Sequence, residues 1–125
     1  MSGAVLDAGA LVGFERNDRR VVAIVARALD LGDPLVVPVG VVAQVWRDGR
    51  RQVRLARLLG SPASEVLPLD DHGARAAGQL CGRSRTADVV DASVVVAARQ
   101  RSLRVVTSDA GDLRRLDPAL DLVTI

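Results

Sequence analysis

The stretch "ADVVDASVVVAARQ" (residues 87–100), followed by "LRVVTS" (residues 103–108), carries most of the information about the fold. After its first turn, the first segment is an almost continuous run of Val and Ala, which predicts a helix buried on all sides. The second segment is short, apolar and rich in Val, which predicts a buried strand. Asp88 and Asp91 nevertheless stand three residues apart at the start of this helix. Because a buried carboxylate is costly without a partner, something must compensate their charge.

The same alternation of short apolar segments and helical segments extends along the chain. The predicted strands are residues 4–7, 35–38, 65–69, 103–108 and 121–125, and the predicted helices are residues 10–30, 39–59, 71–83 and 87–101. Thr86 is the expected N-cap of the last helix. Apolar strands separated by helices indicate a parallel sheet covered on both faces. We therefore predict an α/β fold, and a single domain over residues 1–125, because no repeat or flexible linker interrupts the pattern.

The composition excludes several kinds of chemistry. All 17 basic residues are Arg, which excludes a phosphate-loop Lys, a Schiff base and the Lys that accompanies a nucleophilic Asp. There is one Cys and one His, so neither an internal disulfide nor a Cys/His metal cluster can form; Cys81 is expected in the core and His72 at the surface. No stretch of 18 apolar residues occurs, and the N-terminus does not resemble a signal peptide. These features predict a cytoplasmic protein without a membrane segment.

Acidic residues follow the predicted strands where a ligand is expected. Ligands of open parallel sheets bind outside the carboxyl ends of the strands. Asp7 ends the first strand and Asp109 the fourth, with Asp112 three residues later, and we expect Asp88 and Asp91 at the same edge. Carboxylates without His or Cys are typical ligands of a hard cation such as Mg²⁺ or Mn²⁺. Two alternatives remain: an Arg could compensate the charge, and each Asp alone could be a turn former or helix cap.

The order and spacing of these motifs resemble the PIN domain family, specifically the VapC-type toxins of bacterial toxin–antitoxin pairs. "VLDAGALV" (residues 5–12), "DVVDASVVVAAR" (88–99) and "VVTSDAGDL" (105–113) resemble its first, central and last motifs, and the similarity covers essentially the whole chain. The resemblance implies a Rossmann-like α/β sheet and RNA cleavage that depends on Mg²⁺ or Mn²⁺. It also implies a homodimer, and an antitoxin whose peptide blocks the acidic pocket, often with an inserted Arg.

The resemblance also assigns roles to the acidic residues. Asp7, Asp91 and Asp109 would be the catalytic metal ligands, and Asp88 and Asp112 would add charge to the site. Together they would hold the ion that activates a water for in-line attack on an RNA phosphodiester.

Two positions depart from the family pattern. Gln44 stands where the family usually has a Glu, and Gly9 replaces a small hydroxyl or amide side chain. Gln44 could still contact a metal-bound water, and Ser108 could supply a hydroxyl near the site, although Ser108 could equally be a helix N-cap. The missing charge predicts weaker metal binding, so the alternative function is a PIN-fold module that binds RNA or a partner without cutting. A phosphatase with Asp7 as nucleophile is disfavoured, because its second Asp and its Lys are missing.

Basic residues are needed near an acidic site that acts on a polyanion. Arg47, Arg50, Arg54 and Arg57 follow one another at spacings of three or four, which predicts one stripe of a helix, broken or kinked at Gly49. Such a stripe could contact RNA phosphates and position the RNA without selecting its sequence. The alternative is a solvated helix face. Few aromatic residues are available for base stacking, and Trp46 is expected in the core or in a dimer interface.

Overall fold

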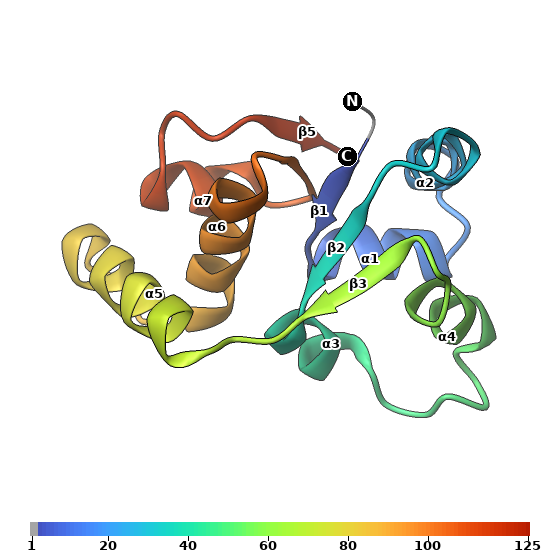
Figure 1. Cartoon of the computed structure of the whole chain (residues 1–125), viewed down its shortest axis with the longest axis horizontal. Coiled ribbons are helices and arrows are strands. Elements are labelled where there is room, and N and C mark those ends of the chain that lie inside the picture. Colours follow the sequence, from blue (N-terminus) through green and yellow to red (C-terminus); the bar gives the residue numbers. More distant parts are fainter. Residues whose placement is uncertain (1–2) are drawn as a thin grey trace.

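The computed structural model describes residues 3–125, and within these residues the chain forms seven helices and five strands (Figure 1). In chain order they are β1 (Ala4–Leu6), α1 (Ala8–Glu15), α2 (Arg19–Leu31), β2 (Leu35–Pro38), α3 (Val39–Val45), α4 (Val53–Leu59), β3 (Ser64–Leu67), α5 (Asp71–Ser84), α6 (Val89–Arg101), β4 (Arg104–Thr107), α7 (Ala110–Leu116) and β5 (Leu122–Thr124).

The five strands form one parallel sheet in the order β3-β2-β1-β4-β5. The chain proceeds outward from β1 to β2 and β3, and then crosses to the other side of β1 to form β4 and β5. The direction of the connections therefore reverses between β1 and β4, and the crevice beyond the carboxyl ends of two such strands is where open α/β sheets bind ligands. The predicted Rossmann-like α/β fold is confirmed.

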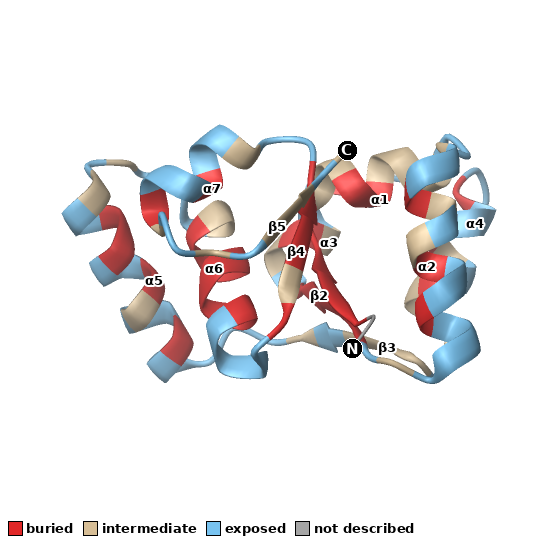
Figure 2. Cartoon of the chain, turned by 90° about the horizontal axis from the view of Figure 1, so that it is seen from above, coloured by how far each residue is buried: buried red, intermediate tan, exposed pale blue. Residues whose placement is uncertain are grey.

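Helices cover both faces of the sheet, as Figure 2 shows. On one face α6 packs against β1, β2 and β4, with α5 and α7 outside it. On the other face lie α1, α2 and α4. Residues 92–98 of α6 are all buried, which confirms the prediction of an enclosed helix. Each fully buried Val contributes on the order of 2 kcal/mol through the hydrophobic effect. None of the helices within residues 3–125 combines the length and apolarity needed to span a bilayer.

The predicted helix over residues 10–30 is wrong, because the structure divides it into α1 and α2. Asn17 adopts a left-handed backbone with φ of 63°, a conformation that Asn tolerates better than most residues. Asp18 then caps α2, and its Oδ1 accepts a hydrogen bond from the backbone N–H of Arg20 at 2.9 Å. Residues 15–20, all polar or charged, interrupt the apolar pattern at this turn, and the Asn-Asp pair within them marks the break.

The predicted helix over residues 39–59 is also two helices, α3 and α4, separated by residues 46–52. The buried Gln52 side chain holds this linker: its Oε1 accepts from the N–H groups of Arg47 at 2.8 Å and Asp48 at 3.0 Å. Its Nε2 donates to the carbonyl of Val45 at 2.8 Å. One amide side chain therefore replaces the backbone bonds that a continuous helix would make. The expected break near Gly49 is confirmed.

Candidate metal centre

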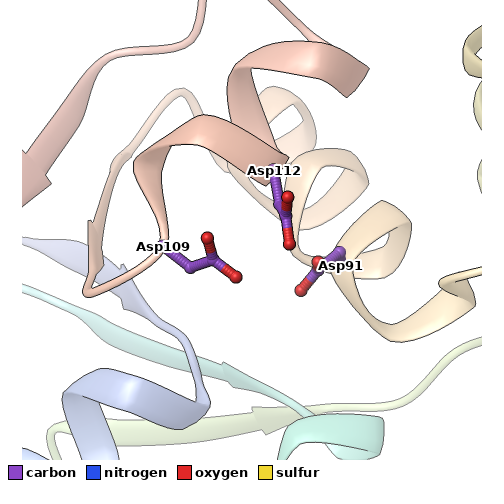
Figure 3. Close-up of side chains that lie close together, drawn as sticks. All are labelled: Asp91, Asp109 and Asp112. Atoms are coloured by element: carbon purple, nitrogen blue, oxygen red, sulfur yellow. The ribbon is translucent and has the colours of Figure 1, made fainter.

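Asp91, Asp109 and Asp112 converge at the carboxyl edge of the sheet (Figure 3). Asp91 lies in the first turn of α6, Asp109 is the N-cap residue of α7, and Asp112 lies in the first turn of α7. Each offers a carboxylate oxygen within 4.8 Å of the others. Two oxygens bound to the same Mg²⁺ are at most about 4.2 Å apart, since each lies about 2.1 Å from the ion. Small side-chain rotations would therefore bring all three onto one cation.

Asp91 experiences the strongest electrostatic strain of the cluster. The pKa of this half-buried carboxyl is raised from 3.8 to about 7, first by burial and then by the charges of Asp88, Asp109 and Asp112. The ionised form of Asp91 is therefore disfavoured in the metal-free protein near neutral pH. A divalent cation at this point would compete with a proton and stabilise the ionised form.

Asp109 and Asp112 interact directly. The hydrogen bond that Asp109 shares with the side chain of Asp112 is the main reason that its pKa is raised, and partial burial and the charge of Asp112 raise it further. The neighbouring Asp112 carboxyl thus disfavours the ionised form of Asp109 when no cation is near.

Asp88 lies beside this cluster but is not part of it. Its Oδ1 accepts a hydrogen bond from the backbone N–H of Asp91 at 2.9 Å, so Asp88 caps α6. The expected N-cap, Thr86, is wrong; its hydroxyl instead accepts from the N–H of Asp88 at 3.3 Å. The cap fixes the first turn of α6 and with it the backbone of Asp91.

Asp7 is also outside the group of three, although it follows β1 as expected. It is only 6% exposed and caps α1, accepting a hydrogen bond from the N–H of Ala10 at 2.9 Å. Burial raises its pKa, and hydrogen bonds from Thr107, Ala10 and Gly9 partly offset that rise. The charge of Asp7 is nevertheless close enough to contribute to the raised pKa of Asp109. Asp7 therefore lies near Asp109 at the same edge but outside the group of three, and its role as a metal ligand stays a prediction.

Thr107, a residue that the sequence pattern does not mark as part of the site, connects Asp7 to the cluster. Its side chain is completely buried at the end of β4. The hydroxyl donates a hydrogen bond to Asp7 and accepts one from the backbone N–H of Asp109 at 2.8 Å. The only signal in the sequence was a hydroxyl residue at the end of an otherwise Val-rich strand. Thr107 ties the ends of β1 and β4 together at the point where the connections reverse.

A hollow of about 110 Å³ opens beside the cluster. Three acidic residues of the site line it together with one hydroxyl, one basic and one apolar side chain: Thr86, Asp88, Asp91, Asp112, Arg115 and Leu116. The space next to the carboxylates can therefore hold a small polar group such as a hydrated ion or a phosphate.

A family model of the PIN domain matches residues 4–118, which include every element of this edge. The chain belongs to the PIN domain family. Curated protein sequences give no match. The family assignment agrees with the resemblance seen in the three acidic motifs.

Solved structures with the same fold as this PIN domain include several protein complexes. A toxin–antitoxin complex from Klebsiella pneumoniae matches with a TM-score of 0.71 and 15% identity, over 97% of this chain and 96% of that one. FitAcB from Neisseria gonorrhoeae matches with a TM-score of 0.68 and 20% identity, over 97% and 96%. VapBC2 from Rickettsia felis, bound to a DNA fragment from its promoter, matches with a TM-score of 0.71 and 14% identity, over 98% of each chain. At such identities the similarity establishes the fold.

The two departures of this PIN domain from the family pattern have different structural settings. Gln44 is exposed on α3, and its side chain makes no hydrogen bond within residues 3–125. Gly9, by contrast, is crowded: a Cβ there would lie 1.9 Å from the Oγ of Ser108. The hydroxyl of Ser108 therefore occupies the space that a side chain at position 9 would need. Ser108 is not an N-cap, since Asp109 takes that place.

The four arginines do not lie on one helix, because the break expected near Gly49 separates α3 from α4 at residues 46–52. Arg47 and Arg50 lie in this linker, and Arg54 and Arg57 lie on α4. The guanidinium of Arg47 donates to the carbonyls of Ala43 at 3.1 Å and Trp46 at 2.7 Å, at the end of α3. Arg54 and Arg57 are exposed and form no ion pair within residues 3–125.

The expected positions of three other residues can also be compared with the structure. Trp46 is 39% exposed, so its placement in the core is wrong, and its role in a dimer stays a prediction. His72 is exposed and Cys81 is buried, as expected.

Proposed function

We propose that this PIN domain is a metal-dependent endoribonuclease, and that it is the toxin of a VapBC-type toxin–antitoxin pair. The observation that carries the proposal is the convergence of Asp91, Asp109 and Asp112 at the point where the strand connections reverse. The fold similarity to toxin–antitoxin complexes over nearly the whole chain supports the second half of the proposal. A homodimer, a VapB-type antitoxin and a cytoplasmic location belong to the same proposal.

The residues present fit a Mg²⁺ or Mn²⁺ ion. All three donors of the cluster are carboxylates, without His or Cys, and such oxygen ligands suit a hard cation. The raised pKa values of Asp91 and Asp109 show that the ionised carboxylates repel one another in the metal-free protein. A divalent cation bound among them would relieve this repulsion. When bound, the ion would supply a water of lowered pKa and would neutralise charge on the reacting phosphate.

The chain's own residues would act around the phosphodiester. Asp91, Asp109 and Asp112 would hold the ion, and Asp7, through Thr107, would keep Asp109 in place. Asp88 would hold the first turn of α6 and add negative charge to the hollow. Asp91 lies on α6 and Asp109 at the start of α7, so the site forms only when the chain is folded.

Residues outside the acidic cluster would position the RNA. Gln44 would offer a neutral oxygen to a bound water, and Ser108 a hydroxyl near Asp7 and Asp109. Arg54 and Arg57, and at the linker Arg50, would contact phosphates without selecting a sequence. Arg47 has less freedom to do so, because its guanidinium is bound to the carbonyls that end α3.

One observation favours a second function, a PIN-fold module that binds RNA or a partner without cutting it. Helix α3 contributes no carboxylate to the cluster, since Gln44 is neutral and exposed. A cation held by fewer charges polarises its water less, which would lower the rate before it abolished binding.

Cleavage of single-stranded RNA by the purified protein distinguishes the two functions. We expect cleavage in Mn²⁺ that EDTA stops. Asp91→Asn should abolish it, because this substitution removes one of the three carboxylates that would hold the ion. Asp30→Asn is the matched control, since Asp30 is an exposed carboxylate near the end of α2, away from the cluster. RNA binding without any cleavage in Mn²⁺ would contradict the nuclease proposal and favour the binding module.

A further inference from the structure

Arg115 is the one basic residue among those that line the hollow beside the acidic cluster. It lies in the last turn of α7, three residues after Asp112, so the two side chains share a face of the helix. The same short helix thus presents a carboxylate of the cluster and a guanidinium to one cavity.

The guanidinium of Arg115 is not neutralised by these acids. Arg115 forms no hydrogen bond or ion pair within residues 3–125, although three carboxylates line the same hollow. Arg99 and Arg101 on the neighbouring helix α6 are instead paired, with Asp117 at 3.0 Å and with Glu65. Arg115 is therefore held beside the cluster by the helix backbone, and its donors are free to bind another anion.

We propose that Arg115 binds a phosphate of the RNA backbone next to the metal site. This inference rests on the proposed function and names a substrate contact within it. Three carboxylates and one divalent cation leave the site with net negative charge, which repels a polyanion. A guanidinium within the same hollow offsets that charge where the phosphate must enter. Its planar donors match two oxygens of one phosphate, and Arg stays charged at any pH that the RNA tolerates.

The competing explanation is that Arg115 only stabilises the C-terminus of α7, where a positive charge interacts favourably with the helix dipole. Arg114 separates the two explanations. It is the adjacent residue, exposed, in the same last turn, and also without a partner within residues 3–125, but it does not line the hollow. Arg114→Ala and Arg115→Ala remove the same charge from the same helix end.

The decisive measurement is the binding of a fluorescein-labelled single-stranded RNA of about 12 nucleotides in Ca²⁺, followed by anisotropy over a range of salt concentrations. For Arg115→Ala we expect an affinity about tenfold lower and a salt slope reduced by about 0.7, the value of one lost phosphate contact on a single strand. Arg114→Ala should stay within about twofold of the wild type, and Arg115→Lys should recover part of the loss, since it restores the charge without the planar fork.

Mn²⁺ affinity and the comparison with Arg114→Ala distinguish a phosphate contact from a role of Arg115 in supporting the cluster or the helix end. Mn²⁺ affinity should be unchanged or slightly higher in Arg115→Ala, because a nearby positive charge is removed; weaker Mn²⁺ binding would mean that Arg115 supports the cluster, and would overturn the inference. Equal losses of RNA affinity in Arg114→Ala and Arg115→Ala would also overturn it. If the wild type cleaves no RNA in Mn²⁺, the proposed nuclease fails, while the binding comparison still decides the role of Arg115.

Discussion

Asp7 and Asp91 are both aspartates at the start of a helix, yet their surroundings are opposite. Asp7 is buried, but it receives hydrogen bonds from Thr107, Ala10 and Gly9, which limit the effect of burial on its pKa. Asp91 is less buried, but it lies among the like charges of the cluster, and its pKa is raised to about 7. Hydrogen bonds within the protein offset part of the cost of burying Asp7, whereas Asp91 faces like charges that only a proton or a cation compensates.

Asp7 and Thr107 hold the ends of the strands in place, whereas Asp91 and its neighbours form the surface that would bind a cation. Hydrogen bonds donated to a buried carboxylate offset part of its desolvation cost, because each hydrogen bond to a charged group contributes about 1.5–3 kcal/mol. A carboxylate that faces other carboxylates costs free energy in the empty protein and regains it on binding. The two halves of this edge should therefore respond in opposite directions when a charge or donor is removed.

The largest effect is expected from Thr107→Val, which removes a hydrogen bond to the buried Asp7. Val has nearly the same shape, but it removes a donor to Asp7 and leaves the backbone N–H of Asp109 without its acceptor in a part-buried hydrogen bond. We expect a loss of about 2 kcal/mol, or about 8 °C in Tm for a chain of this size.

Differential scanning calorimetry with and without Mn²⁺ measures this effect. The control is Thr124→Val on β5, which replaces the exposed register partner of Thr107 and should shift Tm by no more than about 2 °C. A Thr107 variant as stable as the wild type would mean that its hydroxyl does not hold the two strand ends together.

The sheet and most of the acidic cluster could be predicted from the sequence, for identifiable reasons. Strands such as residues 35–38 are buried on both faces, so their apolar character is continuous and easy to recognise. The position of Asp109 and Asp112 followed from the rule that ligands bind at the carboxyl ends of parallel strands. Asp91 followed from the cost of placing a carboxylate on a buried helix.

The remaining features depend on contacts between distant parts of the chain. The break between α3 and α4 is stabilised by Gln52, whose side chain also donates to Glu15, 37 residues away, at 3.3 Å. No local pattern marks such a bond. The role of Thr107 becomes visible only once β1 and β4 are known to be neighbours. The burial of Asp7 and its cap on α1 were not visible in the sequence, and its role as a metal ligand stays a prediction.

A smaller effect is expected from Gly9→Ser, which tests whether Ser108 has taken the place of a side chain at position 9. The new Cβ would lie 1.9 Å from the Oγ of Ser108 and 2.9 Å from its Cβ, so that rotation of Ser108 alone cannot relieve the contact. We expect a loss of about 1–2 kcal/mol, as for other overpacked positions. Chemical denaturation measures it.

The double variant Gly9→Ser, Ser108→Gly should recover more than half of that loss, since the swap returns one hydroxyl to the same space. Gly78→Ser is the control, because nothing lies within 4 Å of a Cβ at that helical position. Equal stability of Gly9→Ser with and without Ser108 would disprove the exchange.

The smallest effect, and the one of opposite sign, is expected from Asp91→Asn in the metal-free protein. The folded pKa of about 7 lies above the unfolded value of 3.8, so between these pH values the folded state keeps a proton that the unfolded state has released. Wild-type stability should therefore fall as pH rises from about 4 to about 7, with the full penalty present above pH 7. Asn carries no charge and removes this penalty.

The expected rise in Tm for Asp91→Asn in EDTA at pH 8 is small, about 2–4 °C, because Asp91 is only partly buried and solvent screens its neighbours. At pH 3.5 the variant and the wild type should melt together. Mn²⁺ should reverse the order at pH 8, since only the wild type gains the full stabilisation of a bound cation. A lower Tm for the variant in EDTA at pH 8 would instead assign Asp91 a partner within the protein, and the carboxylates would then be compensated by the fold rather than by a metal ion.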